Sequence, residues 1–183
     1  MPRLLERLHE DHKHLDRLLD LLERILDRFH EGEEPNYEIL GELLEYMDLY
    51  ADGVHHPNED LIFSRMRDHA DAHHKTIDLL MNQHEALSQI NKQFRASIEG
   101  IVNGEVLRRD LVEAHGRDLV MTLRSHLNLE EKEAFPLARE LLSEDDWSDL
   151  QQQSIKAYDP VFGEVDRERF RALYDQLFAE TQT

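Results

Sequence analysis

The chain has 183 residues, of which 40 are Asp or Glu and 21 are Lys or Arg, so its net charge is −19 when every histidine is neutral. This length predicts a single domain, and the acidic charge argues against nucleic acids and anionic membranes as partners, because both attract clustered basic residues. The absence of cysteine excludes disulfides, thiolate zinc sites, iron–sulfur clusters and a cysteine nucleophile. Twelve histidines accompany the surplus of carboxylates, so nitrogen and oxygen ligands are plentiful.

The distribution of apolar residues indicates a helical protein that does not cross a membrane. Apolar residues recur every three or four positions through long stretches, with few glycines and prolines between them, which is typical of an all-α protein. No apolar run approaches the roughly 20 residues that span a bilayer. The first residues lead directly into an amphipathic pattern in place of a secretory leader, so we expect a cytoplasmic protein.

Four long helices are predicted in chain order. They run from Pro2 to Gly32, from the N-cap Asn36 to about His69, from about residue 72 to Val102, and from about residue 105 to Leu142. The connections are too short for a crossover, so consecutive helices should be antiparallel. The expected fold is therefore an up-down-up-down four-helix bundle over residues 1–142.

Residues 143–183 are expected to form a C-terminal extension of two short helices. Ser143 and Asp146 resemble a capping box that opens the first of them. Asp166 is placed to cap the last helix, whose apolar residues from Phe170 to Phe178 fall on one face. The extension is too small to fold alone, so it should pack on the bundle or on the second subunit of a homodimer.

Two histidines occupy positions where the helical pattern calls for a leucine. His12 lies in the apolar seam of the first helix, and His84 lies in that of the third. An inward-facing imidazole whose hydrogen bonds are unmade costs about 1 to 3 kcal/mol. Two such histidines in one core therefore indicate a shared site.

The second helix carries the doublet His55-His56, and its two members should face opposite ways. At about 100° per residue, His55 and Glu59 share the inward face, whereas His56 and Asp60 lie on the other side. Pro57 could kink the helix and rotate this register. The inward pair is thus predicted to be His55 and Glu59.

The fourth helix repeats the spacing with His126 and Glu130, and residues four apart share a helix face at a separation of about 6 Å. Reflecting residue numbers about the turn centres places these histidines at one level of the bundle, to within about one helical turn. The predicted site comprises His12, His55, Glu59, His84, His126 and Glu130.

The remaining histidines are assigned other roles. His9, one turn before His12, is a candidate additional ligand. Asn91 and His115 are interpreted as a buried polar pair or a channel lining, about three turns from the site. The others are expected at the surface: His14 and His30 singly, and His69, His73 and His74 as a solvated cluster at the second connection.

Four imidazoles and two carboxylates are too many for one tetrahedral zinc ion, and they lack the oxygen-rich shell of calcium or magnesium. They suit two first-row transition ions, with each glutamate bridging or capping and the histidines filling terminal positions. Six protein ligands leave coordination positions open on two ions. Such a centre can carry out chemistry or bind a gas.

These segments together resemble the hemerythrin-like family, also called HHE cation-binding domains. The segments are Glu10-Asp11-His12, His55-His56-Pro57-Asn58-Glu59, His84-Glu85 and His126-Leu127-Asn128-Leu129-Glu130, and the match covers about residues 4–142. The extension resembles that of stand-alone bacterial members. The resemblance implies a non-haem centre of two iron ions, with manganese or zinc as substitutes, that binds dioxygen or another small diatomic or anionic ligand. It also implies that the four histidines of the site are terminal ligands and that Glu59 and Glu130 are bridges.

The resemblance implies roles in oxygen or redox sensing, storage, iron handling or repair under nitrosative stress. The sequence departs from the oxygen carriers of the family, because the residues four before and four after His84 are Leu80 and Ser88 where the carriers place a second histidine. Their longer His-to-Asp spacing on the last helix is also replaced, by His126 and Glu130. These departures favour sensing, oxidation chemistry or iron binding over oxygen carriage. Two other readings stay open: a di-iron enzyme acting on peroxide, nitric oxide or dioxygen, and a helical protein with a structural metal or hydrogen-bonded core histidines.

Overall fold

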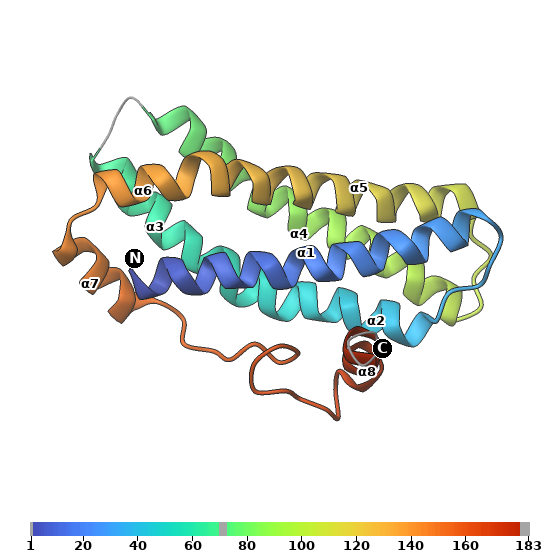
Figure 1. Ribbon diagram of the computed structural model, residues 1–183. Coiled ribbons are helices and arrows are strands. Elements are labelled where there is room, and N and C mark those ends of the chain that lie inside the picture. Colours follow the sequence, from blue (N-terminus) through green and yellow to red (C-terminus); the bar gives the residue numbers. More distant parts are fainter. Residues whose placement is uncertain (1, 70–72, 180–183) are drawn as a thin grey trace.

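The computed structural model describes residues 2–69 and 73–179, and within these ranges helices are the regular secondary structure. Four helical rods form the predicted up-down-up-down bundle (Figure 1). The rods are α1 (Arg3–His30); α2 (Tyr37–Tyr46), η1 (Met47–His55) and α3 (His56–His69); α4 (His74–Val102); and α5 (Arg109–Leu129), η3 (Glu130–Ala134) and α6 (Phe135–Leu141). The segments η1 and η3 are π-helical and continue their rods without a break.

The helix ends follow the predicted signals with two differences. The Asn36 side chain accepts hydrogen bonds from the N–H groups of Glu38 and Ile39, as expected of an N-cap. The fourth rod begins at Arg109, four residues later than expected, after an extended segment. The last helix begins at Arg171, because Asp166 caps an isolated turn that precedes it.

The apolar core is divided into two layers by a polar layer. One layer gathers residues that precede His12 and His84 and follow Glu59 and Glu130, among them Leu8, Ile62, Leu80 and Ala134. The other layer gathers residues on the opposite side of each of these positions, among them Leu15, Ala51, Leu87 and Leu123. The polar side chains between the layers are therefore enclosed by apolar packing from both ends.

The C-terminal helices pack on the bundle. The predicted capping box of Ser143 and Asp146 opens α7 (Glu144–Gln153), which contacts α1 and α3. An extended segment then leads along the bundle to α8 (Arg171–Ala179), which packs against α2 (Figure 1). There the Glu42 carboxylate accepts hydrogen bonds from the N–H groups of Ala172 and Leu173. In the described part of the chain, none of the helices combines the length and the apolar character needed to cross a membrane.

Candidate metal centre

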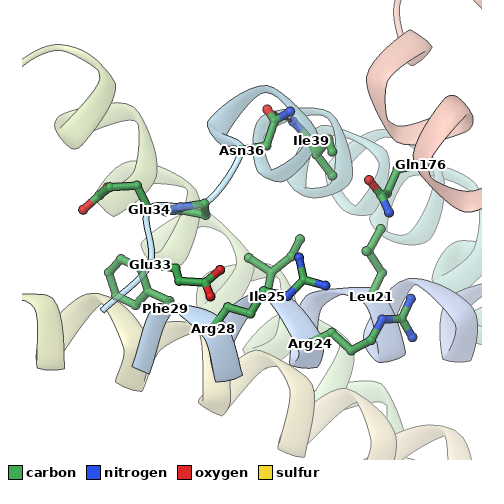
Figure 2. A pocket seen from close by; sticks show the side chains of 11 residues that line it. Leu21, Arg24, Ile25, Arg28, Phe29, Glu33, Glu34, Asn36, Ile39 and Gln176 are labelled. Atoms are coloured by element: carbon green, nitrogen blue, oxygen red, sulfur yellow. Dashed lines mark hydrogen bonds between the residues drawn. The ribbon is translucent and has the colours of Figure 1, made fainter. Parts of the chain in front are cut away.

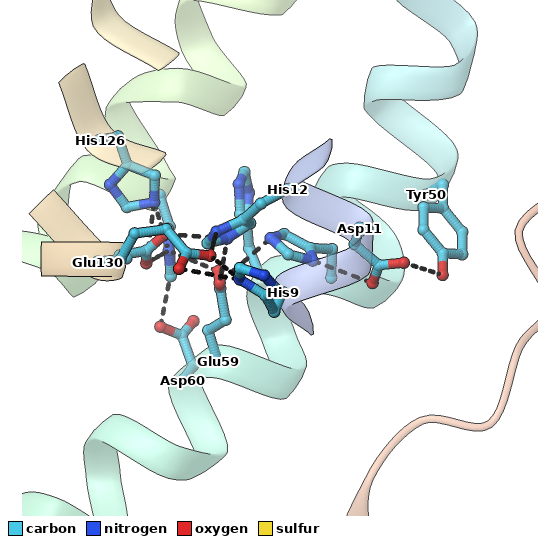
Figure 3. A network of polar contacts seen from close by, with 12 residues as sticks. His9, Asp11, His12, Tyr50, Glu59, Asp60, His126 and Glu130 are labelled. Atoms are coloured by element: carbon cyan, nitrogen blue, oxygen red, sulfur yellow. Dashed lines mark hydrogen bonds and ion pairs between the residues drawn. The ribbon is translucent and has the colours of Figure 1, made fainter. Parts of the chain in front are cut away.

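The structure brings the six predicted site residues together in the polar layer. Figure 3 labels His12, Glu59, His126 and Glu130 among them. The six residues come from all four rods, and none is more than 6 % exposed. His12 lies in α1, and His84 lies in α4. The other four lie where the π-helical segments meet α-helix: His55, Glu59, His126 and Glu130.

Each of the two glutamates lies close to three histidines of the site. Glu59 places Oε1 3.0 Å from His12 Nε2 and 3.1 Å from His55 Nε2, and its Oε2 lies 3.3 Å from His84 Nε2. Glu130 places Oε2 3.4 Å from His12 Nε2, and its Oε1 lies 3.1 Å from His126 Nε2 and 3.5 Å from His84 Nε2. Carboxylates in this arrangement can bridge two cations.

His56 also faces the site, so the prediction that it points away is wrong. It is 4 % exposed, and its ring stacks on that of His84 with centroids 4.4 Å apart. The prediction assumed 100° per residue from Met47, but η1 spans this stretch, and a π-helix turns through a smaller angle per residue. The doublet therefore presents both of its imidazoles to the interior.

Five imidazoles share one mode of attachment. In each, Nδ1 contacts an acceptor outside the cluster, and Nε2 is left to face inward. The five Nδ1 contacts are His12 to Glu131 at 2.7 Å, His55 to Asp11 at 3.2 Å, His56 to Asp52 at 3.1 Å, His84 to Asp60 at 2.8 Å and His126 to Gln83 at 2.9 Å. An acceptor of this kind is what commonly fixes the ring of a metal-binding histidine. These acceptors were not predicted from the sequence, although the spacing of four between Asp52 and His56 was a usable signal.

Several polar atoms inside the cluster have no hydrogen-bond partner. Five buried atoms have no hydrogen-bond partner: His55 Nε2, His56 Nε2, Glu59 Oε2 and both carboxylate oxygens of Glu130. In addition, His84 Nε2 and His126 Nε2 face each other at 3.0 Å, so one of the two nitrogens must be protonated. Buried polar atoms are normally satisfied, and cations at the centre would satisfy these. The donor set therefore fits metal ions.

The donors form two groups that share one carboxylate. His12, His55 and Glu59 can place ligand atoms within 4.8 Å of one another, and so can His56, Glu59, His84 and His126. The mixture of imidazole and carboxylate suits first-row transition ions. Each group could hold a metal ion.

In the absence of a cation, protonated histidines lie next to ionised carboxylates in the cluster. Burial disfavours a charged imidazole, but the nearby carboxylates of Glu130, Glu131 and Glu59 outweigh it and raise the pKa of His12 well above its usual value. In the same way Asp60 and the two glutamates raise the pKa of His84 to about 12 against the effect of burial.

The two members of the doublet shift in opposite directions. Burial acts against a charge on His55, but Glu59 and Asp11 outweigh it and raise its pKa to about 8. Burial dominates at His56, whose pKa falls to about 4. His56 is therefore neutral at pH 7, which is the form of histidine that binds metals.

A third group of potential ligands lies beside the centre. Asp11, His14 and Asp159 can place ligand atoms within 4.8 Å of one another, and they are joined to their surroundings by hydrogen bonds. Asp11 accepts from the Tyr50 hydroxyl at 3.0 Å, as Figure 3 shows, and Asp159 accepts from the Tyr46 hydroxyl at 2.9 Å. We describe this group as a hydrogen-bond network that supports His55.

The interpretation of Asn91 and His115 as a pair is wrong. Asn91 is buried and donates to the carbonyl oxygen of Leu44, whereas His115 is half-buried and contacts Ser97 and Gln93. The reflection gave their level along the bundle but not their direction around each helix.

Other histidines also differ in part from expectation. His9 contacts Glu131 and not the inner glutamates, and His14 is half-buried, with its ring stacked on Phe162. His30 is exposed, as expected. Of the cluster at the second connection, His69 is exposed, as expected, and contacts Asp146, whereas His73 and His74 are half-buried; residues 70–72 lie outside the described ranges.

Two of the surface cavities of the bundle differ in their distance from the centre. One, of about 220 Å³, adjoins the centre and is lined by Leu5, His9, Glu131, Phe135 and Arg139. The other, of about 110 Å³, lies where α1 is joined to α2, with the side chains of Leu21, Ile25 and Ile39 among its lining (Figure 2). Only the first includes a residue that contacts a predicted ligand, because Glu131 holds His12.

The comparisons agree with this geometry. The family model described as the hemerythrin HHE cation binding domain matches residues 3–138, which contain all seven inward-facing side chains. Comparison with curated proteins and with solved structures gives no match. Since the family model covers most of the chain, the chain belongs to the hemerythrin HHE cation-binding domain family.

Proposed function

We propose that the chain is a non-haem di-iron protein whose centre binds dioxygen or a related small ligand, in a role of sensing, storage or iron handling. The observation that supports this most is the common orientation of the five imidazoles, held at Nδ1 from outside and directed through Nε2 at two buried carboxylates. An outer acceptor fixes the tautomer and makes the imidazole a stronger ligand.

In this proposal the two ions would have different numbers of protein ligands. One ion would lie beside His12 and His55, the other beside His56, His84 and His126, with Glu59 and Glu130 between them. His56 would supply the histidine that the third helix lacks. The His12 side would have fewer protein donors, so an exogenous ligand would complete the shell there.

The iron ions would supply open coordination positions and a redox couple, and the side chains would orient and shield them. Burial opposes ionisation of Glu59, but contacts with His55, His12 and His84 hold its pKa well below the usual range. Burial and the charge of Glu59 oppose ionisation of Glu130, but His126 and His12 lower its pKa overall. Both carboxylates are therefore ionised and able to bind cations at pH 7. The apolar layers on either side exclude water.

Metal analysis and absorption spectra test this proposal. We expect about two iron ions per chain, and a near-ultraviolet or visible charge-transfer band after exposure to air. The Glu130→Gln variant should lose the band and most of the iron. Glu133→Gln, an exposed change of the same kind in the same segment, should keep both. A folded wild-type protein that retains no iron when loaded under anaerobic conditions would refute the proposal.

A further inference from the structure

The seven inward-facing side chains are sealed from solvent, so a cation has to enter past a residue that can move. None of the seven is more than 6 % exposed. The Nδ1 acceptors form the next layer outward, and they differ in exposure: Asp11 is 5 % exposed, whereas Glu131 is 31 % and Asp60 is 37 % exposed. Entry is therefore easiest to place at Glu131 or at Asp60.

Glu131 has two properties that point to it and not to Asp60. It lines the 220 Å³ cavity between α1 and the end of the fourth rod. It is also shared by two histidines, since Oε1 lies 2.7 Å from His12 Nδ1 and 2.8 Å from His9 Nδ1. Within the described residues, Asp60 contacts one histidine, His84. The cavity thus brings together a half-exposed imidazole and a carboxylate that already contacts a proposed ligand.

We propose that His9 and Glu131 form a capture site for a divalent cation, from which the ion passes to the His12 side of the centre. This inference rests on the proposed function. An imidazole and a carboxylate are ligands that Fe²⁺ accepts, and the few protein donors leave the ion free to exchange. His12 is the next donor inward, because its Nδ1 faces Glu131 while its Nε2 faces Glu59 at 3.0 Å. This one ring therefore connects the outer carboxylate with the inner one.

Packing around the cavity leaves His12 one polar approach. The Phe135 ring lines the cavity and stacks on the His12 imidazole, with centroids 5.0 Å apart and an interplanar angle of 14°. This apolar ring covers the outer face of His12 and leaves the edge toward Glu131 as the polar approach. His9 is 43 % exposed and can meet an ion from solution.

The rate of iron uptake tests the capture site separately from the final iron content. Metal-free protein is mixed with Fe²⁺ without oxygen, and bound iron is counted against time after rapid desalting. We expect His9→Ala to fill at least about ten times more slowly than wild type, with the same final iron per chain. Glu131→Gln should be slowed in the same way, because its amide oxygen can still accept from His12 but carries no charge.

A matched control lies at the other end of the bundle. His30 Nδ1 contacts Glu113 at 3.0 Å, and His30 is 72 % exposed, so His30→Ala removes a similar surface pair without touching the cavity. It should fill at the wild-type rate. Equal rates in His9→Ala and wild type would overturn the capture site, and so would a lower final iron content in His9→Ala, since His9 would then belong to the permanent site. A wild-type protein that takes up no iron would overturn the proposed function and this inference together.

Discussion

Asn58 pairs with the main chain of Ile155 through two hydrogen bonds. Its Nδ2 donates to the Ile155 carbonyl oxygen at 3.2 Å, and the Ile155 N–H donates to Asn58 Oδ1 at 2.7 Å. Asn58 is fully buried and lies between His55 and Glu59 in the chain. Arg7 adds a second anchor by donating to the same carbonyl at 3.0 Å. The segment between α7 and α8 is thus attached to the rod that carries three of the proposed ligands, His55, His56 and Glu59.

We predict that Asn58→Ala destabilises the protein by about 1 to 3 kcal/mol, because the Ile155 N–H loses its acceptor and the Ile155 carbonyl keeps only the hydrogen bond from Arg7. Urea unfolding of the metal-free protein measures this change. The segment between α7 and α8 should also be cleaved faster by proteases. Asn128→Ala is the control, since Asn128 is exposed and bonds only within its own helix. Equal stability of the two variants would contradict the prediction.

Gly116 allows the close approach of three helices. A Cβ atom there would lie 2.7 Å from Leu26 Cδ2 and 2.9 Å from Phe94 Cζ, so Gly116→Ala should cost about 1 to 3 kcal/mol through overpacking. Gly41→Ala is the matched change: a Cβ at Gly41, inside α2, meets nothing within 4 Å. It should stabilise the protein by about 0.5 to 1 kcal/mol. Denaturant titrations should give these opposite signs, and a shared sign would contradict the packing argument.

The stability of the metal-free protein should depend on pH through His12, His55 and His84. Each has a raised pKa when folded, so its stabilising contribution is complete below the unfolded value of about 6.5 and is lost as the pH rises through the folded value. We predict that the free energy of unfolding falls between pH 6.5 and 8, with about 1 kcal/mol of the fall due to His55. Urea unfolding at both pH values checks this. The fall should be smaller in His55→Gln, and an undiminished fall would exclude His55 as its source.

The four rods were predictable because the pattern of apolar residues on a helix is local and repeated many times. The common level of His12, His55, His84 and His126 was also predictable, because it depends only on helix rise and turn position. The direction in which a side chain points around the helix axis was not predictable in the same way, because every departure from 100° per residue adds to the error. Because η1 precedes His56, the level of His56 along the bundle agreed with that of the other histidines, but the direction of its side chain was predicted wrongly.

His56 tests this correction directly. We predict that His56→Ala weakens binding of the second iron ion by at least ten-fold, because removing even an outer acceptor costs a metal site about 10 to 100-fold. Iron per chain should then fall from about two toward one at limiting metal. Asp52→Asn, which keeps an acceptor for His56 Nδ1 at reduced charge, should have a smaller effect in the same direction.

The control for His56 is His115→Ala, which removes a half-buried histidine that contacts Ser97 and Gln93 away from the centre. Its iron content should match wild type. Circular dichroism of each metal-free variant separates loss of a ligand from loss of the fold. If folded His56→Ala binds two iron ions with wild-type affinity, His56 is a packing residue, and the second ion is held by His84, His126 and the two glutamates alone.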